Sequence, residues 1–159
     1  MCIRDSFAAA TDLSAYISGV SPETRAAMKD FGMKLGAAYQ IYDDCLDLVG
    51  SEDQFGKTLR TDLEKGKLTL PMLYLLEEAG DTQREILQKR IIQQEELDLT
   101  VLAGIAEYQG AIGRSLDYAT ALLREASESL SLLEESAYRQ ALSEMLNFLL
   151  KLLGTLQKG

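Results

Sequence analysis

A helical repeat of apolar side chains in the first third of the sequence limits the possible folds more than any other feature. Its members recur at alternating steps of three and four residues, which places them on one face of a helix. Ser21, Pro22 and Glu23 stand just before it, and they are typical of a helix start because serine caps the first turn, proline fits the first helical position and an acid suits the helix dipole. We therefore predict a central helix over 22–50. Its buried seam comprises Met28, Phe31, Leu35, Ala38, Tyr42, Cys45 and Val49.

The remainder of the chain also favours helix. It has only two prolines and is rich in Leu, Ala, Glu and Gln, and its 159 residues, 47% of them hydrophobic, suffice for one core. We expect an all-α bundle in a single domain. The polar, glycine-bearing stretch 50–65 predicts a loop of functional length. Further helices are expected from Phe7 onward, from 66–69 with Pro71 in the first turn, over 81–94, over 95–108 with an end at Gly110, along a stripe from Ile112 to Leu133, and over 137–153.

Charge and composition exclude several functions. Lys and Arg number 16 against 25 Asp and Glu, and the net charge of −9 opposes binding to nucleic acid or anionic membrane. No apolar run approaches the ~20 residues of a membrane span, and no signal peptide is evident, so we expect a cytoplasmic protein. Cys2 and Cys45 cannot form a disulfide framework. Because the chain has no histidine, any bound metal must be held by oxygen.

An acidic stripe lies on the predicted central helix. Gly36, Gln40, Asp43 and Asp47 follow at steps of four, three and four, and Asp44 is offset by about 100°. Like charges at this spacing destabilise a helix, so a cation is required, and carboxylate oxygens suit Mg²⁺ or Mn²⁺. On spacing alone, a solvated acidic patch is the better interpretation.

The segment that follows the acids favours the metal interpretation. Residues 57–67 carry four basic and two acidic side chains, a net charge of +2 in an acidic protein. Magnesium held by acids beside flexible lysines would form a diphosphate clamp. Taken singly, each lysine is better explained as part of a mobile solvated loop. The basic residues are Lys57, Arg60, Lys65 and Lys67, and the acids are Asp62 and Glu64.

These motifs in this order resemble the second aspartate-rich region of trans-polyprenyl diphosphate synthases. The resemblance rests on the run from Gly36 through Gln40, Asp43, Asp44 and Asp47, and then on Gly56-Lys57, Asp62 and Gly66-Lys67-Leu68-Thr69-Leu70-Pro71, and it continues upstream through Phe7-Ala8-Ala9-Ala10 and Tyr16-Ile17-Ser18-Gly19. It implies an isoprenoid-synthase helical bundle and head-to-tail prenyl transfer, in which an allylic diphosphate condenses with isopentenyl diphosphate. It also implies Mg²⁺, and a homodimer for the full-length protein.

The resemblance assigns roles to individual residues. Asp43 would be a direct metal ligand, and Asp44 and Asp47 would ligate or support through water. Lys57 and Lys67 would grip diphosphate oxygens. Gln40 would steady the same site and Asp62 would act from behind it, although a surface or capping role suits either of these two residues as well.

Three departures from the family pattern qualify the expectation. Cys2-Ile3 stands where the family has Lys-Thr, so we expect residues 1–6 to be foreign or misassembled and residues 7–159 to be the C-terminal part of a helical domain. Arg60 stands where glycine is usual. The family's first aspartate-rich motif has no counterpart here, so the chain alone should be inactive. A non-catalytic subunit that modulates a complete synthase and a terpene cyclase fragment are the alternatives.

Overall fold

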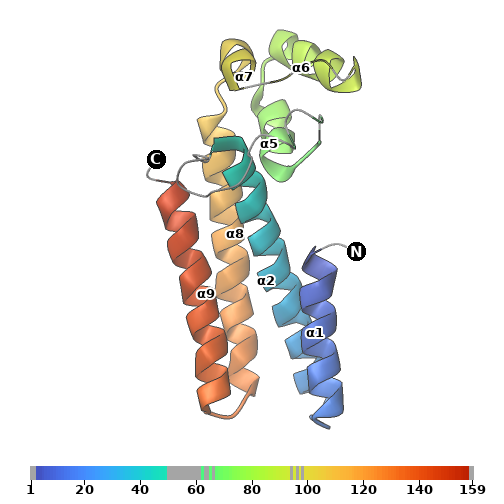
Figure 1. Ribbon diagram of the computed structural model, residues 1–159, viewed down its shortest axis with the longest axis vertical. Helices are drawn as coiled ribbons and strands as arrows, with labels where there is room; N and C mark the ends of the chain where they lie inside the picture. Colours follow the sequence, from blue (N-terminus) through green and yellow to red (C-terminus); the bar gives the residue numbers. More distant parts are fainter. Residues whose placement is uncertain are drawn as a thin grey trace. The chain divides into compact units, whose positions relative to one another are not determined.

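The computed structural model describes residues 3–49, 62, 65, 67–93, 95, 97 and 99–157. Helices, and no strands, make up the regular structure of this described part, which confirms the all-α fold class (Figure 1). The helices are α1 (Ile3–Ile17), α2 (Pro22–Val49), α5 (Leu70–Glu78), α6 (Asp81–Gln93), α7 (Leu99–Ile105), α8 (Gln109–Ser129), the 3₁₀ helix η1 (Leu130–Leu132) and α9 (Ala137–Leu156).

The chain divides into two compact units. Unit 1 contains residues 3–40 and 118–157 of the described chain, and unit 2 contains its residues between 41 and 117. Helices α2 and α8 contribute to both units. Of the loop predicted over 50–65, only Asp62 and Lys65 fall within the described residues.

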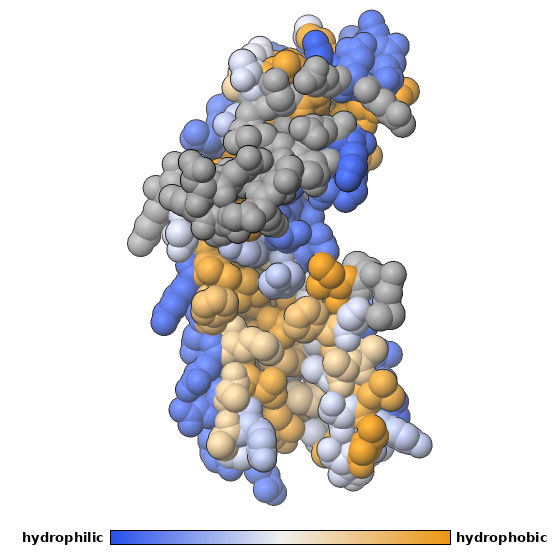
Figure 2. Space-filling model, viewed as in Figure 1, coloured by the Kyte–Doolittle hydropathy of each residue, from blue (hydrophilic) through white to orange (hydrophobic). Residues whose placement is uncertain are grey.

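Unit 1 is built from long helices that lie side by side (Figure 1). Helix α1 packs closely on α2, because a Cβ added at Gly32 or Gly36 would meet the backbone of α1. An ion pair reinforces this contact, with Arg25 Nε 2.6 Å from Asp12 Oδ1. Lys34 links α2 to α8 through Glu125, at 3.2 Å. Figure 2 shows apolar side chains gathered over this unit, and its exposed apolar residues include Ile17, Tyr138 and Phe148.

Unit 2 has its own apolar core, to which the short helices contribute. Leu75 of α5, Leu87 of α6, Leu102 of α7 and Leu116 of α8 are almost completely inaccessible to solvent. Thr69 is the N-cap of α5 and Pro71 lies in its first turn, where the missing proline N–H breaks no helical hydrogen bond. These short helices therefore form a packed layer rather than an extended loop.

The predicted central helix is confirmed nearly residue for residue. It starts at Pro22, and the Thr24 N–H donates to Ser21 Oγ at 3.1 Å as expected of an N-cap. Of the seven seam residues, all but Val49 are buried, and Val49 is half-buried at the last position of the helix.

One helix start lies where the sequence pattern gives no signal, and one predicted boundary is wrong. The sequence indicates a helix already under way at Phe7, and α1 begins at Ile3, where Asp5 suits the first turn and the backbone of Arg4 packs against Gly36. Gly110 was expected to end a helix, but it lies in the first turn of α8. The Glu107 carboxylate accepts the N–H groups of Gln109 and Gly110 there, so the helix starts at a position that the glycine had suggested as a stop.

Candidate functional site

The three acids of the stripe, Asp43, Asp44 and Asp47, lie on the part of α2 that belongs to unit 2. Asp43 and Asp44 are half-buried, whereas Asp47 is only 8% exposed. Ile41 and Tyr42, which precede these acids on the helix, are buried. Gln40 is half-buried and is the last residue of unit 1, three positions before Asp43 on the same helix.

Asp47 and Lys67 are brought together by Asp62. The backbone N–H of Asp62 donates to Asp47 Oδ2 at 3.0 Å. The Lys67 N–H donates to the Asp62 carbonyl oxygen at 2.9 Å, and the Lys67 ammonium forms an ion pair with the Asp62 carboxylate. Asp62 therefore contacts both Asp47 of α2 and Lys67, and it links these two predicted site residues.

Electrostatics ties Lys67 to the same acids. The hydrogen bond to Asp62 is the main cause of the raised pKa of Lys67, and the charges of Asp62, Asp44 and Asp47 add to it. The lysine side chain is 57% exposed, so its ammonium lies beside the acids yet remains open to solvent. It can therefore serve either as a counter-ion to the acids or as a contact for an incoming anion.

A buried thiol lies behind the acids. Cys45 is fully buried, and burial, together with the charge of Asp44, raises the pKa of its thiol to about 12. The Ser115 hydroxyl of α8 hydrogen-bonds the thiol and donates to the Ala111 carbonyl oxygen at 2.8 Å. The thiol is thus a packing group that joins α2 to α8, as the sequence predicted.

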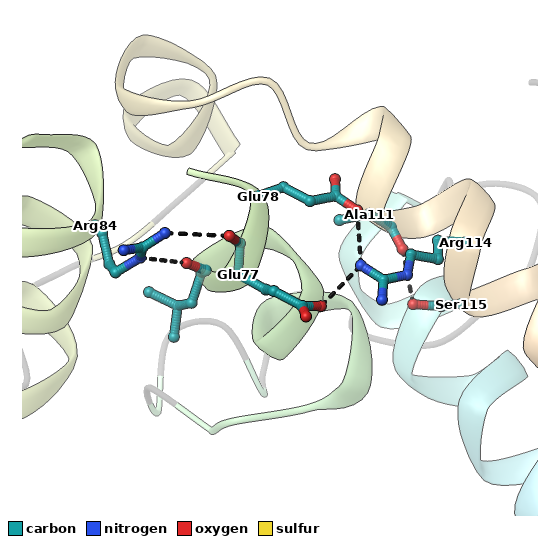
Figure 3. A network of polar contacts seen from close by, with 7 residues as sticks. Glu77, Glu78, Arg84, Ala111, Arg114 and Ser115 are labelled. Atoms are coloured by element: carbon teal, nitrogen blue, oxygen red, sulfur yellow. Dashed lines mark hydrogen bonds and ion pairs between the residues drawn. The ribbon is translucent and has the colours of Figure 1, made fainter. Parts of the chain in front are cut away.

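Two arginines hold the helix that follows Lys67 (Figure 3). Figure 3 shows Arg114 of α8 reaching Glu77 at 2.8 Å and Glu78 at 3.2 Å. The Arg114 guanidinium also stacks 4.0 Å above the Tyr74 ring. Arg84 of α6 caps the end of α5: it donates to the carbonyl oxygens of Leu76 and Glu77, and also to that of Ala79. These contacts satisfy the last carbonyls of α5 and fix it against α8. Neither arginine stands in a recognisable motif, so the sequence predicted no role for them.

The donor chemistry of the stripe fits a hard cation. The acids offer only oxygen ligands, which Mg²⁺ prefers. Among the described residues, no group of three or more Asp, Glu or Cys side chains is placed so that it could hold a metal ion. One or two carboxylates with water and substrate phosphates form the usual magnesium site, and Asp43 and Asp44 can supply that share.

The other predicted residues contribute less to the described site. Lys57 lies outside the described residues, so its role stays a prediction. Lys65 is exposed.

A shallow hollow of about 520 Å³ lies in unit 1 around the start of α9 and is lined by Glu135, Ser136, Arg139, Gln140 and Ser143, none of which belongs to the predicted site. None of the described helices is long and apolar enough to cross a membrane.

The family model and the similar proteins of known function all point to one family. The family model described as polyprenyl synthetase matches residues 4–108. The chain is 38% identical over 151 residues to the short chain isoprenyl diphosphate synthase of Methanothermobacter thermautotrophicus, covering 91% of this chain and 44% of that protein. It is 34% identical over 143 residues to the octaprenyl diphosphate synthase of Haemophilus influenzae, covering 86% and 42%.

Solved structures agree. A polyprenyl synthase from Caulobacter crescentus, complexed with calcium and isoprenyl diphosphate, matches with a TM-score of 0.74 at 30% identity over 91% of this chain and 44% of that one. A geranylgeranyl pyrophosphate synthetase from Pyrococcus horikoshii matches with a TM-score of 0.73 at 27% identity, over 94% and 47%. The chain thus spans less than half the length of these relatives.

Proposed function

Because the chain belongs to the polyprenyl synthetase family, we propose that it supplies part of an active site for head-to-tail prenyl transfer. In this reaction an allylic diphosphate releases its diphosphate to leave a carbocation. The double bond of isopentenyl diphosphate attacks that carbocation, and loss of a proton gives a longer polyprenyl diphosphate. The chain's share of the work is to bind and orient the diphosphate that leaves.

The proposal is carried by the contact between the acids and Lys67. Half-buried Asp43 and Asp44 lie on the same helix as Asp47, and Asp62 contacts Asp47 and pairs with the Lys67 ammonium. Carboxylates alone would repel a diphosphate, and a lysine alone would bind it weakly in water. Together with a divalent cation, these groups suit the leaving diphosphate.

Each residue has a part in the proposal. Asp43 is a direct ligand of Mg²⁺, for which Mn²⁺ can substitute, and Asp44 and Asp47 ligate or support it. The cation, when bound, neutralises charge on the diphosphate as it leaves. Lys57 and Lys67 contact the diphosphate oxygens and Gln40 steadies the same groups, while Asp62 orients Lys67 from behind.

The alternatives are less well supported. The similar proteins named above are diphosphate synthases, which supports synthase chemistry over a terpene cyclase. A modulating subunit has no need for an ordered contact between Lys67 and the acids. Since the chain spans less than half of its relatives, we expect the 159-residue polypeptide to elongate no allylic diphosphate by itself, and detectable elongation would contradict that expectation. For the full-length enzyme we propose a cytoplasmic homodimer.

Binding of inorganic pyrophosphate to the 159-residue chain tests the site without requiring turnover. Isothermal titration calorimetry with and without MgCl₂ is expected to give binding that requires magnesium. Asp43→Asn and Lys67→Ala should each weaken it at least about tenfold, because each removes a charge-assisted contact.

The matched control is Glu85→Gln, which removes one negative charge from an exposed position on α6 of the same unit. It should leave pyrophosphate affinity unchanged. Binding that is independent of magnesium, or that weakens equally in Asp43→Asn and Glu85→Gln, would refute the proposed site. Circular dichroism of each variant verifies that the helices are retained.

A further inference from the structure

The proposed function leaves two roles open for Asp47, as a metal ligand or as a support. Its surroundings differ from those of Asp43 and Asp44. Those two side chains are half-buried, whereas Asp47 is only 8% exposed. A buried carboxylate is stable only where hydrogen bonds replace the water it has lost.

One such bond leads directly to the basic side of the site. Asp47 Oδ2 accepts the backbone N–H of Asp62 at 3.0 Å. A hydrogen bond from a backbone N–H to a carboxylate is among the stronger kinds, so it fixes Asp62 against α2. Asp47 Oδ2 is thus engaged by the protein backbone.

Asp62 passes this anchoring on to Lys67 through two contacts. Its carbonyl oxygen accepts the Lys67 N–H at 2.9 Å, and its carboxylate pairs with the Lys67 ammonium. The Lys67 carbonyl oxygen in turn accepts the N–H of Thr69, the N-cap of α5, at 3.0 Å. A continuous set of hydrogen bonds thus runs from α2 to the start of α5.

We propose that Asp47 is a positioning residue, which anchors Asp62 and through it holds Lys67 at the site, rather than a ligand of the metal. This inference rests on the proposed function for its meaning in diphosphate binding. It agrees with the usual magnesium site, in which one or two carboxylates share the ion with water and phosphate.

Two substitutions separate positioning from ligation. Asp47→Asn keeps an oxygen that can accept the Asp62 N–H but removes the negative charge, and Asp47→Ala removes both. For a positioning residue, magnesium-dependent pyrophosphate affinity should fall no more than about threefold in Asp47→Asn and at least about tenfold in Asp47→Ala. For a metal ligand, Asp47→Asn should lose affinity as severely as Asp43→Asn, and that result would overturn the inference.

A second readout needs neither metal nor pyrophosphate. NMR in magnesium-free buffer measures hydrogen exchange at the backbone amides of Asp62 and Lys67. These amides should stay protected in Asp47→Asn, and their exchange should accelerate at least about tenfold in Asp47→Ala. Unchanged protection in Asp47→Ala would overturn the anchoring role. If Asp47→Ala fails to fold, Asp47→Asn alone decides the outcome. Loss of protection in Asp47→Asn would overturn the anchoring role, and retained protection would support it.

The two readouts also separate this inference from the proposed function. If the parent chain binds no pyrophosphate but the exchange pattern follows the expectation, the anchor stands and the diphosphate site fails. If pyrophosphate binds with magnesium while Asp47→Asn matches Asp43→Asn, the site stands and the anchor fails. Glu85→Gln serves as the charge-matched control in both experiments.

Discussion

Replacing Gly32 by alanine should test how closely α1 and α2 pack in unit 1. A Cβ built at this position would lie 2.6 Å from the Phe7 carbonyl oxygen and 2.9 Å from Ala8 Cα, and closer still to the Thr11 hydroxyl oxygen. Ordinary contacts begin near 3.4 Å. The Thr11 side chain can rotate away, but the two backbone atoms can move only if the helices separate by several tenths of an ångström.

The expected cost follows from two opposing effects. Overpacking of this kind costs about 3 kcal/mol, because separation of the helices loses van der Waals contacts along the whole interface. Alanine regains up to about 1 kcal/mol through its higher helix propensity. The free energy of unfolding should therefore fall by about 2 kcal/mol, which lowers the melting temperature by roughly 4 to 8 °C in a chain of this length.

A second glycine provides the control. Gly113 lies inside α8 and has no atom within 4 Å of the position its Cβ would take. Gly113→Ala should raise the free energy of unfolding by about 0.5 to 1 kcal/mol through propensity alone. Urea denaturation followed by circular dichroism measures both variants. A Gly32→Ala chain as stable as the parent, with Gly113→Ala stabilised as expected, would refute the close packing of α1 on α2.

Three further substitutions probe other contacts. Arg114→Ala should lower the free energy of unfolding by about 1 kcal/mol in urea denaturation, because it removes the Tyr74 stacking and two exposed ion pairs. Arg124 is exposed on the same helix, and Arg124→Ala should lower it less. Equal losses in the two variants would contradict the Arg114 contacts. Ser136→Ala should cost about 1 kcal/mol because it removes the N-cap of α9, and Ser136→Asp should restore it. In a Cys2→Ser background, Cys45 should not react with Ellman's reagent at pH 8 until the chain unfolds, because its folded pKa is about 12. The neutral thiol favours the folded state below about pH 9, and this contribution should decline as pH rises from 9 toward 12, relative to Cys45→Ala.

The parts of the fold that could be predicted are those with a long, regular period. The seam from Met28 to Cys45 predicted α2 and its buried face, because a 3.6-residue repeat over many turns leaves few alternatives. The start at Pro22 could also be predicted, because Ser21 is a typical N-cap residue and its hydroxyl oxygen accepts a backbone N–H of the first turn. Local chemistry was sufficient in both cases.

The sequence was insufficient where tertiary contacts decide the structure. The first turn of α1 has no apolar period, and close packing of its backbone against Gly36 is visible only in three dimensions. Gly110 resembles a helix stop in sequence, but Glu107 accepts its N–H and makes it part of a helix start. Arg84 and Arg114 escaped notice because their partners are backbone carbonyls and residues more than 30 positions away.

The negative charge of the acids on α2 is partly balanced within the protein itself. Asp43 and Asp47 are four residues apart on α2, a spacing at which like charges destabilise a helix, so a cation was expected. In unit 2 the protein itself supplies a positive charge, because Asp44 and Asp47 both raise the pKa of Lys67. Lys67 therefore offsets part of the negative charge of Asp44 and Asp47.

A metal that approaches this site must compete with Lys67 for the same negative charge. Its ammonium is exposed and can turn outward toward an anion, whereas Asp62 keeps its backbone in place through a hydrogen bond to Asp47. Entry of the cation and release of the lysine toward diphosphate are thus coupled by charge balance. On this reasoning, Lys67→Ala should strengthen binding of magnesium alone while weakening binding of magnesium with pyrophosphate, and calorimetric titration with MgCl₂ in the absence of pyrophosphate measures the first effect directly. Weaker binding of magnesium alone in Lys67→Ala would contradict the competition.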